Sequence, residues 1–110
     1  MLIYVDIDET ICTLAGQDPE ELDYSKSSPI VENITAVNNL YDAGNTIIYW
    51  TARGTKSGID WSEITKNQFL SWGVKCHDLQ FGKPAYDLFI CDKVLNSRRW
   101  EEEMKTKSKT

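Results

Sequence analysis

The run Asp6-Ile7-Asp8-Glu9-Thr10 places two aspartates and a threonine within five residues, directly after an apolar stretch. An aspartate held at the end of a strand can attack phosphorus, which gives an aspartyl-phosphate. A second aspartate two residues on can protonate the leaving oxygen and later activate water. Carboxylates crowded together repel one another unless a cation shares the site, and Mg²⁺ prefers oxygen ligands. The run is therefore typical of phosphate-ester chemistry that uses Asp6 and Asp8.

Further polar residues follow later apolar stretches of the chain. Thr51 and Arg53 come after residues 45–50, Lys83 lies before the stretch 86–91, and Asp92 directly follows that stretch. Thr51 is expected to donate a hydrogen bond to a phosphoryl oxygen, and Lys83 is expected to supply positive charge. Arg53 is interpreted either as a contact for the substrate's leaving group or as a solvated loop residue, with equal weight.

The apolar pattern predicts alternating strands and helices. Short continuous apolar runs with β-branched and aromatic residues predict buried strands, and apolar residues at spacings of three and four predict helices. The predicted order is strand, helix, strand, helix, strand, strand and helix, over residues 2–5, 28–43, 45–50, 60–72, 74–78, 86–91 and 94–104. This alternation predicts an α/β protein with a three-layer, Rossmann-like parallel sheet and helices on both faces.

Such a sheet brings the polar residues together. The carboxyl ends of parallel strands share one edge, and ligands bind there, near the point where strand order reverses. Residues that follow the strands, among them Asp6, Thr51 and Asp92, are therefore expected to converge.

Asp6-Ile7-Asp8-Glu9-Thr10 resembles the D-x-D-x-T signature of the haloacid dehalogenase superfamily. Thr51, Lys83 and Asp92 resemble its second, third and fourth motifs, in the family's order, so the resemblance covers residues 2–93. It implies a phosphomonoester hydrolase (a phosphatase) with Asp6, Asp8, Thr51 and Lys83 as catalytic residues. It also implies Mg²⁺ held by the side chain of Asp6, the backbone carbonyl of Asp8 and the side chain of Asp92, and contacts from Thr10 and Arg53 to the substrate.

The resemblance also implies a single HAD-like hydrolase domain over residues 1–104, because the intervals between motifs leave no room for a cap domain. Two residues depart from the family pattern. Glu9 stands where many members have glycine, so the turn after Asp6 must accept a side chain. Cys91 stands where the fourth motif often has a second acid. If that acid is the metal ligand in the family, its replacement by Cys91 lowers the affinity for the metal ion.

Composition and charge narrow the class of protein and its expected location. The chain has 110 residues, 41% of them apolar, and a net charge of −5. No apolar run is long enough to span a bilayer, and an N-terminus without a basic segment does not resemble a signal peptide. Three cysteines without a C-x-x-C pair are a poor disulfide framework, which favours a cytoplasmic location. The acidic balance does not favour nucleic acid, and residues 105–110 are expected to form a flexible tail.

Three functions remain open from the sequence. The first is a phosphatase, the second a receiver-like domain that accepts a phosphoryl group as a switch, and the third an inactive HAD-like binding module. A loop or small hairpin over residues 12–27 and the loop 53–58 are expected to flank the site. The acids of the first segment would repel highly anionic substrates, which favours a small phosphorylated metabolite. An uncapped site would otherwise accept a macromolecule or be closed by a second subunit in a homo-oligomer.

Overall fold

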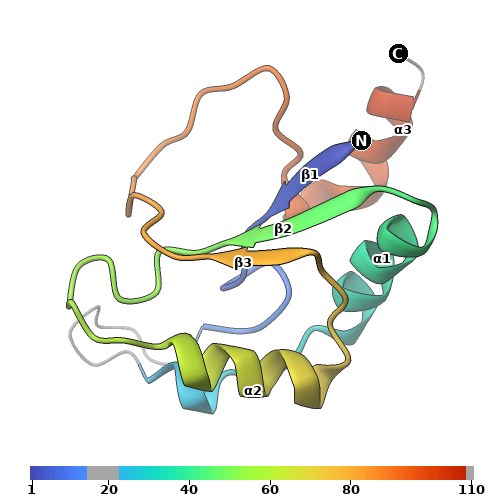
Figure 1. Ribbon diagram of the computed structural model, residues 1–110. Helices are drawn as coiled ribbons and strands as arrows, with labels where there is room; N and C mark the ends of the chain where they lie inside the picture. Colours follow the sequence, from blue (N-terminus) through green and yellow to red (C-terminus); the bar gives the residue numbers. More distant parts are fainter. Residues whose placement is uncertain (15–22, 109–110) are drawn as a thin grey trace.

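Three parallel strands form the sheet, in the order β1 (Leu2–Val5), β2 (Thr46–Trp50) and β3 (Asp78–Gln80) (Figure 1). The computed structural model describes residues 1–14 and 23–108, with side chains as far as residue 104. In the register, Leu2 pairs with Thr46, and Ile48 pairs with Asp78. The described part of the chain is thus a small α/β protein with a Rossmann-like parallel sheet, as the sequence predicted at this coarse level.

Three α-helices accompany the sheet: α1 (Val31–Asp42), α2 (Ser62–Trp72) and α3 (Trp100–Ser108). Short 3-10 turns, η1 (Tyr24–Lys26) and η2 (Ser97–Arg99), precede α1 and α3. The predicted helix ends are confirmed, because the chain leaves α1 through Gly44 and α2 through Gly73, both with positive φ. The start of α1 differs: Ile30, and not Ser28, holds the capping position, without a side-chain cap.

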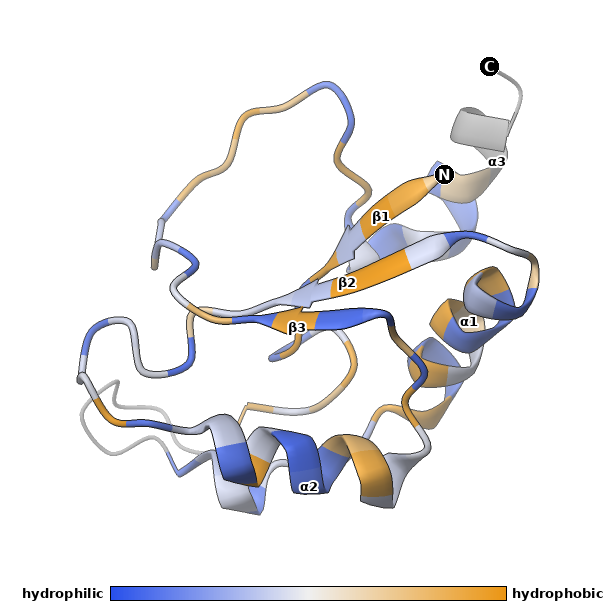
Figure 2. Ribbon diagram, viewed as in Figure 1, coloured by the Kyte–Doolittle hydropathy of each residue, from blue (hydrophilic) through white to orange (hydrophobic). Residues whose placement is uncertain are grey.

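The core lies between the sheet and the helices α1 and α2. Ile47 and Tyr49 point from β2 to this side and are fully buried, together with Val37 of α1. Phe69 of α2 packs edge-on against Tyr49, with ring centroids 4.9 Å apart. Figure 2 shows the apolar stretches of β1 and β2 beside the apolar parts of α1. These contacts fix the strand ends on which the polar residues lie.

The prediction of helices on both faces is not met among the described residues. Right-handed crossovers between strands in the consecutive order β1-β2-β3 put α1 and α2 on the same face. On the other face, Leu2 and Tyr4 of β1 are 62% and 51% exposed. This described order contains no reversal either, so the expected switch point does not occur in this sheet.

The predicted strand 86–91 is wrong in this structure. Residues 81–96 form no helix or strand, and Figure 1 shows them as a wide arc standing away from the sheet. Leu88 is 76% exposed and Ile90 is 87% exposed. An apolar run of this length is compatible with a strand, but it becomes one only where a neighbouring strand accepts its backbone hydrogen bonds.

Two further predicted segments lie at the end of the chain and after the first motif. Helix α3 continues to Ser108, so residues 105–108 of the predicted tail are helical, while 109–110 lie outside the described residues. Most of the expected loop or hairpin at 12–27, namely residues 15–22, also lies outside them. None of the described helices combines the length and hydropathy needed to span a bilayer.

Candidate active site at the carboxyl edge of the sheet

A tight turn follows β1 and presents Asp6 and Asp8. The amides of Thr10 and Ile11 both donate to the carbonyl of Ile7, at 3.1 and 2.9 Å. Glu9 adopts a φ of 62°, a left-handed conformation that is rare for residues other than glycine. The turn therefore accepts the Glu9 side chain, as the sequence required, by holding it in a strained backbone conformation of the kind that clusters at functional sites.

Asp6 and Lys83 form the central charged pair of the site. The Nζ of Lys83 lies 3.5 Å from Oδ1 of Asp6, and the same oxygen accepts a hydrogen bond from the amide of Ile7. The Lys83 side chain is 12% exposed, whereas that of Asp6 is 42% exposed. Burial raises the pKa of the Asp6 carboxyl above its ordinary value, although the charge of Lys83 opposes the shift. A partly accessible carboxylate thus lies beside a nearly buried ammonium group, as predicted.

Two aromatic rings flank Lys83, and sequence reasoning missed this role for both. Its Nζ lies 5.7 Å from the ring centre of Trp50 and 5.2 Å from that of Tyr86. An ammonium group within about 6 Å of an aromatic ring is attracted to it. Trp50 was assigned to packing, although the alternation along β2 already placed it on the face opposite Tyr49. No signal marked Tyr86, because it stood in a predicted strand.

Asp8 is held by Arg53 in a two-point ion pair. Arg53 Nε donates to Oδ2 of Asp8 at 3.1 Å, and its NH2 group donates to Oδ1 at 2.9 Å. The remaining donors of Arg53 reach Thr65 and Gln68 on α2, at 3.0 and 2.6 Å, and the sulfur of Cys12 at 3.6 Å. All five N–H groups of the guanidinium are therefore engaged.

The surroundings of Arg53 make it a buried link between loops. Its side chain is 0% exposed, and its guanidinium lies 4.7 Å from the ring centre of Tyr24. Burial raises the pKa of the Cys12 thiol to about 12, so this sulfur stays protonated and donates to Asp8. Neither sequence interpretation of Arg53 describes this: it is not solvated, and it has no unengaged N–H group for a substrate.

The two threonines of the predicted site lie in different settings. Thr51 is 1% exposed, and its hydroxyl accepts a hydrogen bond from the amide of Arg53 at 3.1 Å. The backbone carbonyl of Thr51 accepts a hydrogen bond from the amide of Lys83, which joins the end of β2 to the segment that carries this lysine. Thr10 is placed elsewhere, with its hydroxyl 3.4 Å from that of Ser97. Thr51 therefore belongs to the cluster, which is formed with Asp6, Asp8, Arg53 and Lys83. The substrate contact of Thr10 stays a prediction.

The expected set of metal ligands is not brought together. Within residues 1–14 and 23–108, no group of three His, Cys, Asp or Glu side chains is placed to hold a metal ion. Asp92 is exposed on the arc 81–96, beside the thiol of Cys91. The Asp8 carboxylate is engaged by Arg53, which leaves Asp6 as the acid available in the cluster. These residues do not fit a site built on Asp6, Asp8 and Asp92, because Asp92 follows no strand that would carry it to the sheet edge.

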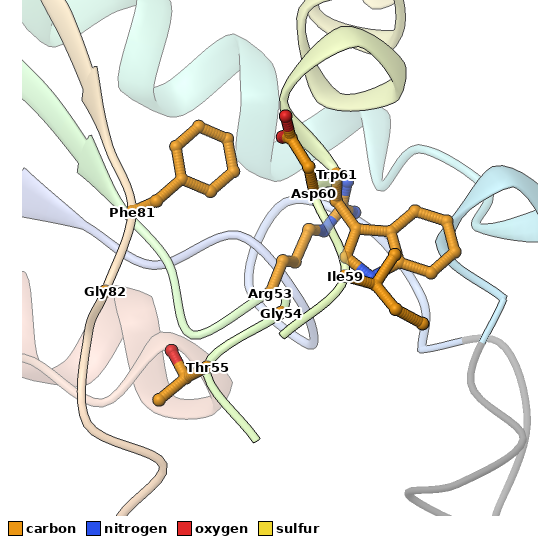
Figure 3. A pocket seen from close by; sticks show the side chains of 8 residues that line it. All are labelled: Arg53, Gly54, Thr55, Ile59, Asp60, Trp61, Phe81 and Gly82. Atoms are coloured by element: carbon orange, nitrogen blue, oxygen red, sulfur yellow. The ribbon is translucent and has the colours of Figure 1, made fainter. Parts of the chain in front are cut away.

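A pocket of about 190 Å³ opens next to this cluster (Figure 3). Its lining residues come from the loop after β2 and from the segment after β3: Arg53, Gly54, Thr55, Ile59, Asp60, Trp61, Phe81 and Gly82. In Figure 3, Phe81 and Gly82 form one side, Ile59 and Trp61 form the other, and Arg53 and Gly54 lie between them. The sequence singled out the loop 53–58 as a flank of the site but not the aromatic walls.

Comparisons with known proteins address the fold. No family model matches the sequence, and no curated protein matches it significantly. A crystal structure of a target protein from Vibrio cholerae is similar, with a TM-score of 0.78 and 21% identity, over 98% of this chain and 97% of that one. The two chains share a fold. At 21% identity this likeness shows the fold and nothing about activity. It extends over nearly the whole of both chains, including the regions that flank the cluster.

Proposed function

We propose that this protein is a phosphomonoester hydrolase of the HAD type, with Asp6 as the nucleophile. The observation that carries the proposal is the pair of Asp6 and Lys83, whose charged atoms lie 3.5 Å apart at the carboxyl edge of the sheet. A carboxylate that is 42% exposed can reach a substrate, and the neighbouring ammonium attracts a phosphate dianion to it. The order of the four motifs supports the same assignment.

The proposed reaction has two steps. An oxygen of Asp6 attacks phosphorus, the bond from phosphorus to the ester oxygen breaks, and that oxygen takes a proton from Asp8 and leaves as an alcohol. Water then gives a proton back to Asp8 and attacks the aspartyl-phosphate, which releases inorganic phosphate and restores Asp6. Lys83 stabilises the negative charge on the transferring group in both steps, because a fixed cation in a partly buried site is already oriented.

The proposal includes a requirement for Mg²⁺. This ion commonly binds through one or two carboxylates together with substrate phosphate oxygens and water, so Asp6 would hold it together with the substrate phosphate. When bound, it would neutralise charge between the carboxylate and the phosphate. No ligand role for Asp92 is part of the proposal.

A receiver-like switch is the second candidate, and the pair of Asp8 and Arg53 favours it. Hydrolysis needs a group that moves a proton, and the sequence assigned that role to Asp8. With both of its oxygens engaged by Arg53, Asp8 is less free to act on a leaving group or on water. A phosphorylated Asp6 would then persist, as a switch requires.

One assay separates the two candidates. Wild type, Asp6→Asn and Lys83→Met are incubated with an aryl phosphate, with and without Mg²⁺, and released phosphate is measured. Turnover that needs Mg²⁺, disappears in Asp6→Asn and falls about 10²–10³-fold in Lys83→Met supports the hydrolase. Lys75→Met is the matched control, because Lys75 pairs with Asp42 on the surface at 2.8 Å.

The same proteins are then treated with acetyl phosphate and weighed by mass spectrometry. One stable phosphoryl group on wild type, absent from Asp6→Asn and without turnover, would replace the hydrolase by the switch. The absence of both turnover and labelling would overturn both candidates.

A further inference from the structure

The pocket beside Arg53 is joined to the segment that carries Lys83. Gly82, in the wall of the pocket, directly precedes Lys83 in the chain. The hydroxyl of Thr55, also in the wall, donates to the carbonyl of Lys83 at 2.8 Å. The pocket therefore borders the backbone of the segment whose Lys83 side chain forms the phosphate position proposed above.

The size of the pocket limits what enters it. Its volume of about 190 Å³ is below the roughly 300 Å³ at which pockets for drug-sized ligands begin. A nucleoside or a longer chain exceeds this space, whereas a group of the size of one sugar unit matches it.

The walls of the pocket are apolar, with few polar groups. Ile59, Trp61 and Phe81 supply apolar surface, and Ile59 is 54% exposed. Binding sites for small molecules combine such walls with a small number of polar groups that fix orientation. The carbon-bound hydrogens of a polyol or sugar can pack on these side chains while its hydroxyls face the polar groups.

The charges of the lining residues disfavour a second anion. Arg53 has no unengaged N–H group, and Asp8 balances its charge. Asp60 accepts a hydrogen bond from the amide of Ser62 at 2.9 Å. Hydrogen bonds from Ser62 lower the pKa of the Asp60 carboxyl, with a smaller contribution from the charge of Lys66, so Asp60 is ionised at neutral pH. Of the two charged lining residues, Arg53 is paired closely with Asp8, whereas Asp60 has only the weaker influence of Lys66, so the less compensated charge of the lining is negative.

We propose that this pocket selects the leaving group of the substrate, and that it takes a neutral, hydroxyl-bearing group of sugar size in preference to an anionic one. The inference rests on the proposed hydrolase function and names its substrate class. Asp60 is the specificity-determining residue: it accepts hydrogen bonds from hydroxyl groups and repels a carboxylate or second phosphate.

The test compares two substrates of the same length. Sorbitol 6-phosphate has a neutral leaving group, and 6-phosphogluconate differs by a carboxylate at the far end. Wild type is expected to favour sorbitol 6-phosphate in kcat/KM by about tenfold, the size of a close, partly screened charge repulsion. Asp60→Asn, which keeps an oxygen for the amide of Ser62, is expected to reduce this preference at least about fivefold.

Glu63→Gln is the matched control, since Glu63 lies in the first turn of α2 and is exposed but does not line the pocket. It is expected to leave the preference unchanged. Equal kcat/KM for the two substrates in wild type, or an unchanged preference in Asp60→Asn, would overturn the pocket assignment while leaving the hydrolase intact.

Binding provides a second readout that does not need turnover. Ligand-observed saturation-transfer NMR is run with both compounds on wild type and on Asp60→Asn. Signal from sorbitol 6-phosphate but not from 6-phosphogluconate, with the difference lost in the variant, supports the pocket even if no phosphate is released. If neither compound binds, or if both bind alike, the pocket assignment fails on its own, whatever the aryl phosphate assay shows.

Discussion

Asp8 and Arg53, 45 residues apart in the chain, meet in a two-point ion pair with donor–acceptor distances of 2.9 and 3.1 Å. The guanidinium also bonds Thr65 and Gln68 of α2, so this single side chain ties the turn after β1 to the helix that follows β2. The position of the candidate nucleophile, two residues before Asp8, therefore depends on a buried arginine.

Breaking this pair should destabilise the fold strongly. The side chains of Arg53 and Asp8 are 0% and 17% exposed, so removal of one partner leaves a buried charge uncompensated. Arg53→Met is expected to lower the free energy of unfolding by about 3–5 kcal/mol. Urea denaturation of Arg53→Met, Asp8→Asn and the double variant should give a coupling free energy of about 1–3 kcal/mol.

The pair of Lys75 and Asp42 provides the comparison, because its side chains are 48% and 53% exposed. Its coupling free energy should not exceed about 1 kcal/mol. Equal coupling in the two pairs would contradict the buried role of Arg53.

The raised pKa of Asp6 predicts opposite effects on activity and on stability. Because burial raises this pKa, the acidic limb of the kcat/KM profile should lie above the ordinary aspartate value of about 3.9. A raised pKa means that the folded state binds the proton more tightly than the unfolded state. The associated stability is present at low pH and is lost as pH rises through the folded pKa.

Asp6→Asn should therefore abolish turnover and yet be no less stable than wild type at pH 7, with the difference shrinking as pH falls through the raised pKa of Asp6 in the folded state and changing no further below about 4. Thermal denaturation across this pH range measures it. Asp42→Asn, an exposed substitution, should change the free energy of unfolding by no more than about 1 kcal/mol, the limit set by its surface pair with Lys75. A clear loss of stability in Asp6→Asn at pH 7 would show that the pair with Lys83 outweighs burial.

Gly54 holds the wall of the pocket in place. Its φ is +82°, and a Cβ at this position would collide with the carbonyl oxygen of Ile59. Gly58 has a φ of +74° in the same loop, but a Cβ there meets open space. Gly58→Ala should lose about 1–2 kcal/mol from the left-handed backbone alone, and Gly54→Ala clearly more. Similar losses in urea denaturation would mean that the loop adjusts freely around Gly54.

Residue 90, on the apolar arc 81–96 after β3, is expected to tolerate substitution with little change in stability. Ile90 is 87% exposed, whereas Ile47 is 0% exposed. Ile90→Ala should change the free energy of unfolding by less than about 0.5 kcal/mol, while Ile47→Ala should lower it by about 2–5 kcal/mol. A loss of 2 kcal/mol or more, about what a core truncation removes, in Ile90→Ala would show that residue 90 is buried in solution, as the sequence pattern indicates.

The sequence by itself predicted the order of strands and helices as far as β3, the helix ends at Gly44 and Gly73, and the approach of Lys83 to Asp6. Each follows from a local pattern: apolar periodicity defines an element, a glycine ends a helix, and parallel strands carry the residues after them to one edge. The sequence placed the third strand too early, because β3 (Asp78–Gln80) shares one residue with the predicted range 74–78. That the turn must accept a side chain at Glu9 was implied by the resemblance, because many members of the superfamily have glycine there.

The tertiary structure decided what depends on distant partners. Arg53 is buried because residues of the turn after β1, of η1 and of α2 surround it, which no spacing near residue 53 records. The stretch 86–91 has a strand-like composition, but a strand needs a partner for its backbone hydrogen bonds, and in this structure Asp92 consequently does not join the cluster. Local sequence sets what a segment is able to form, and the contacts around it decide what it forms.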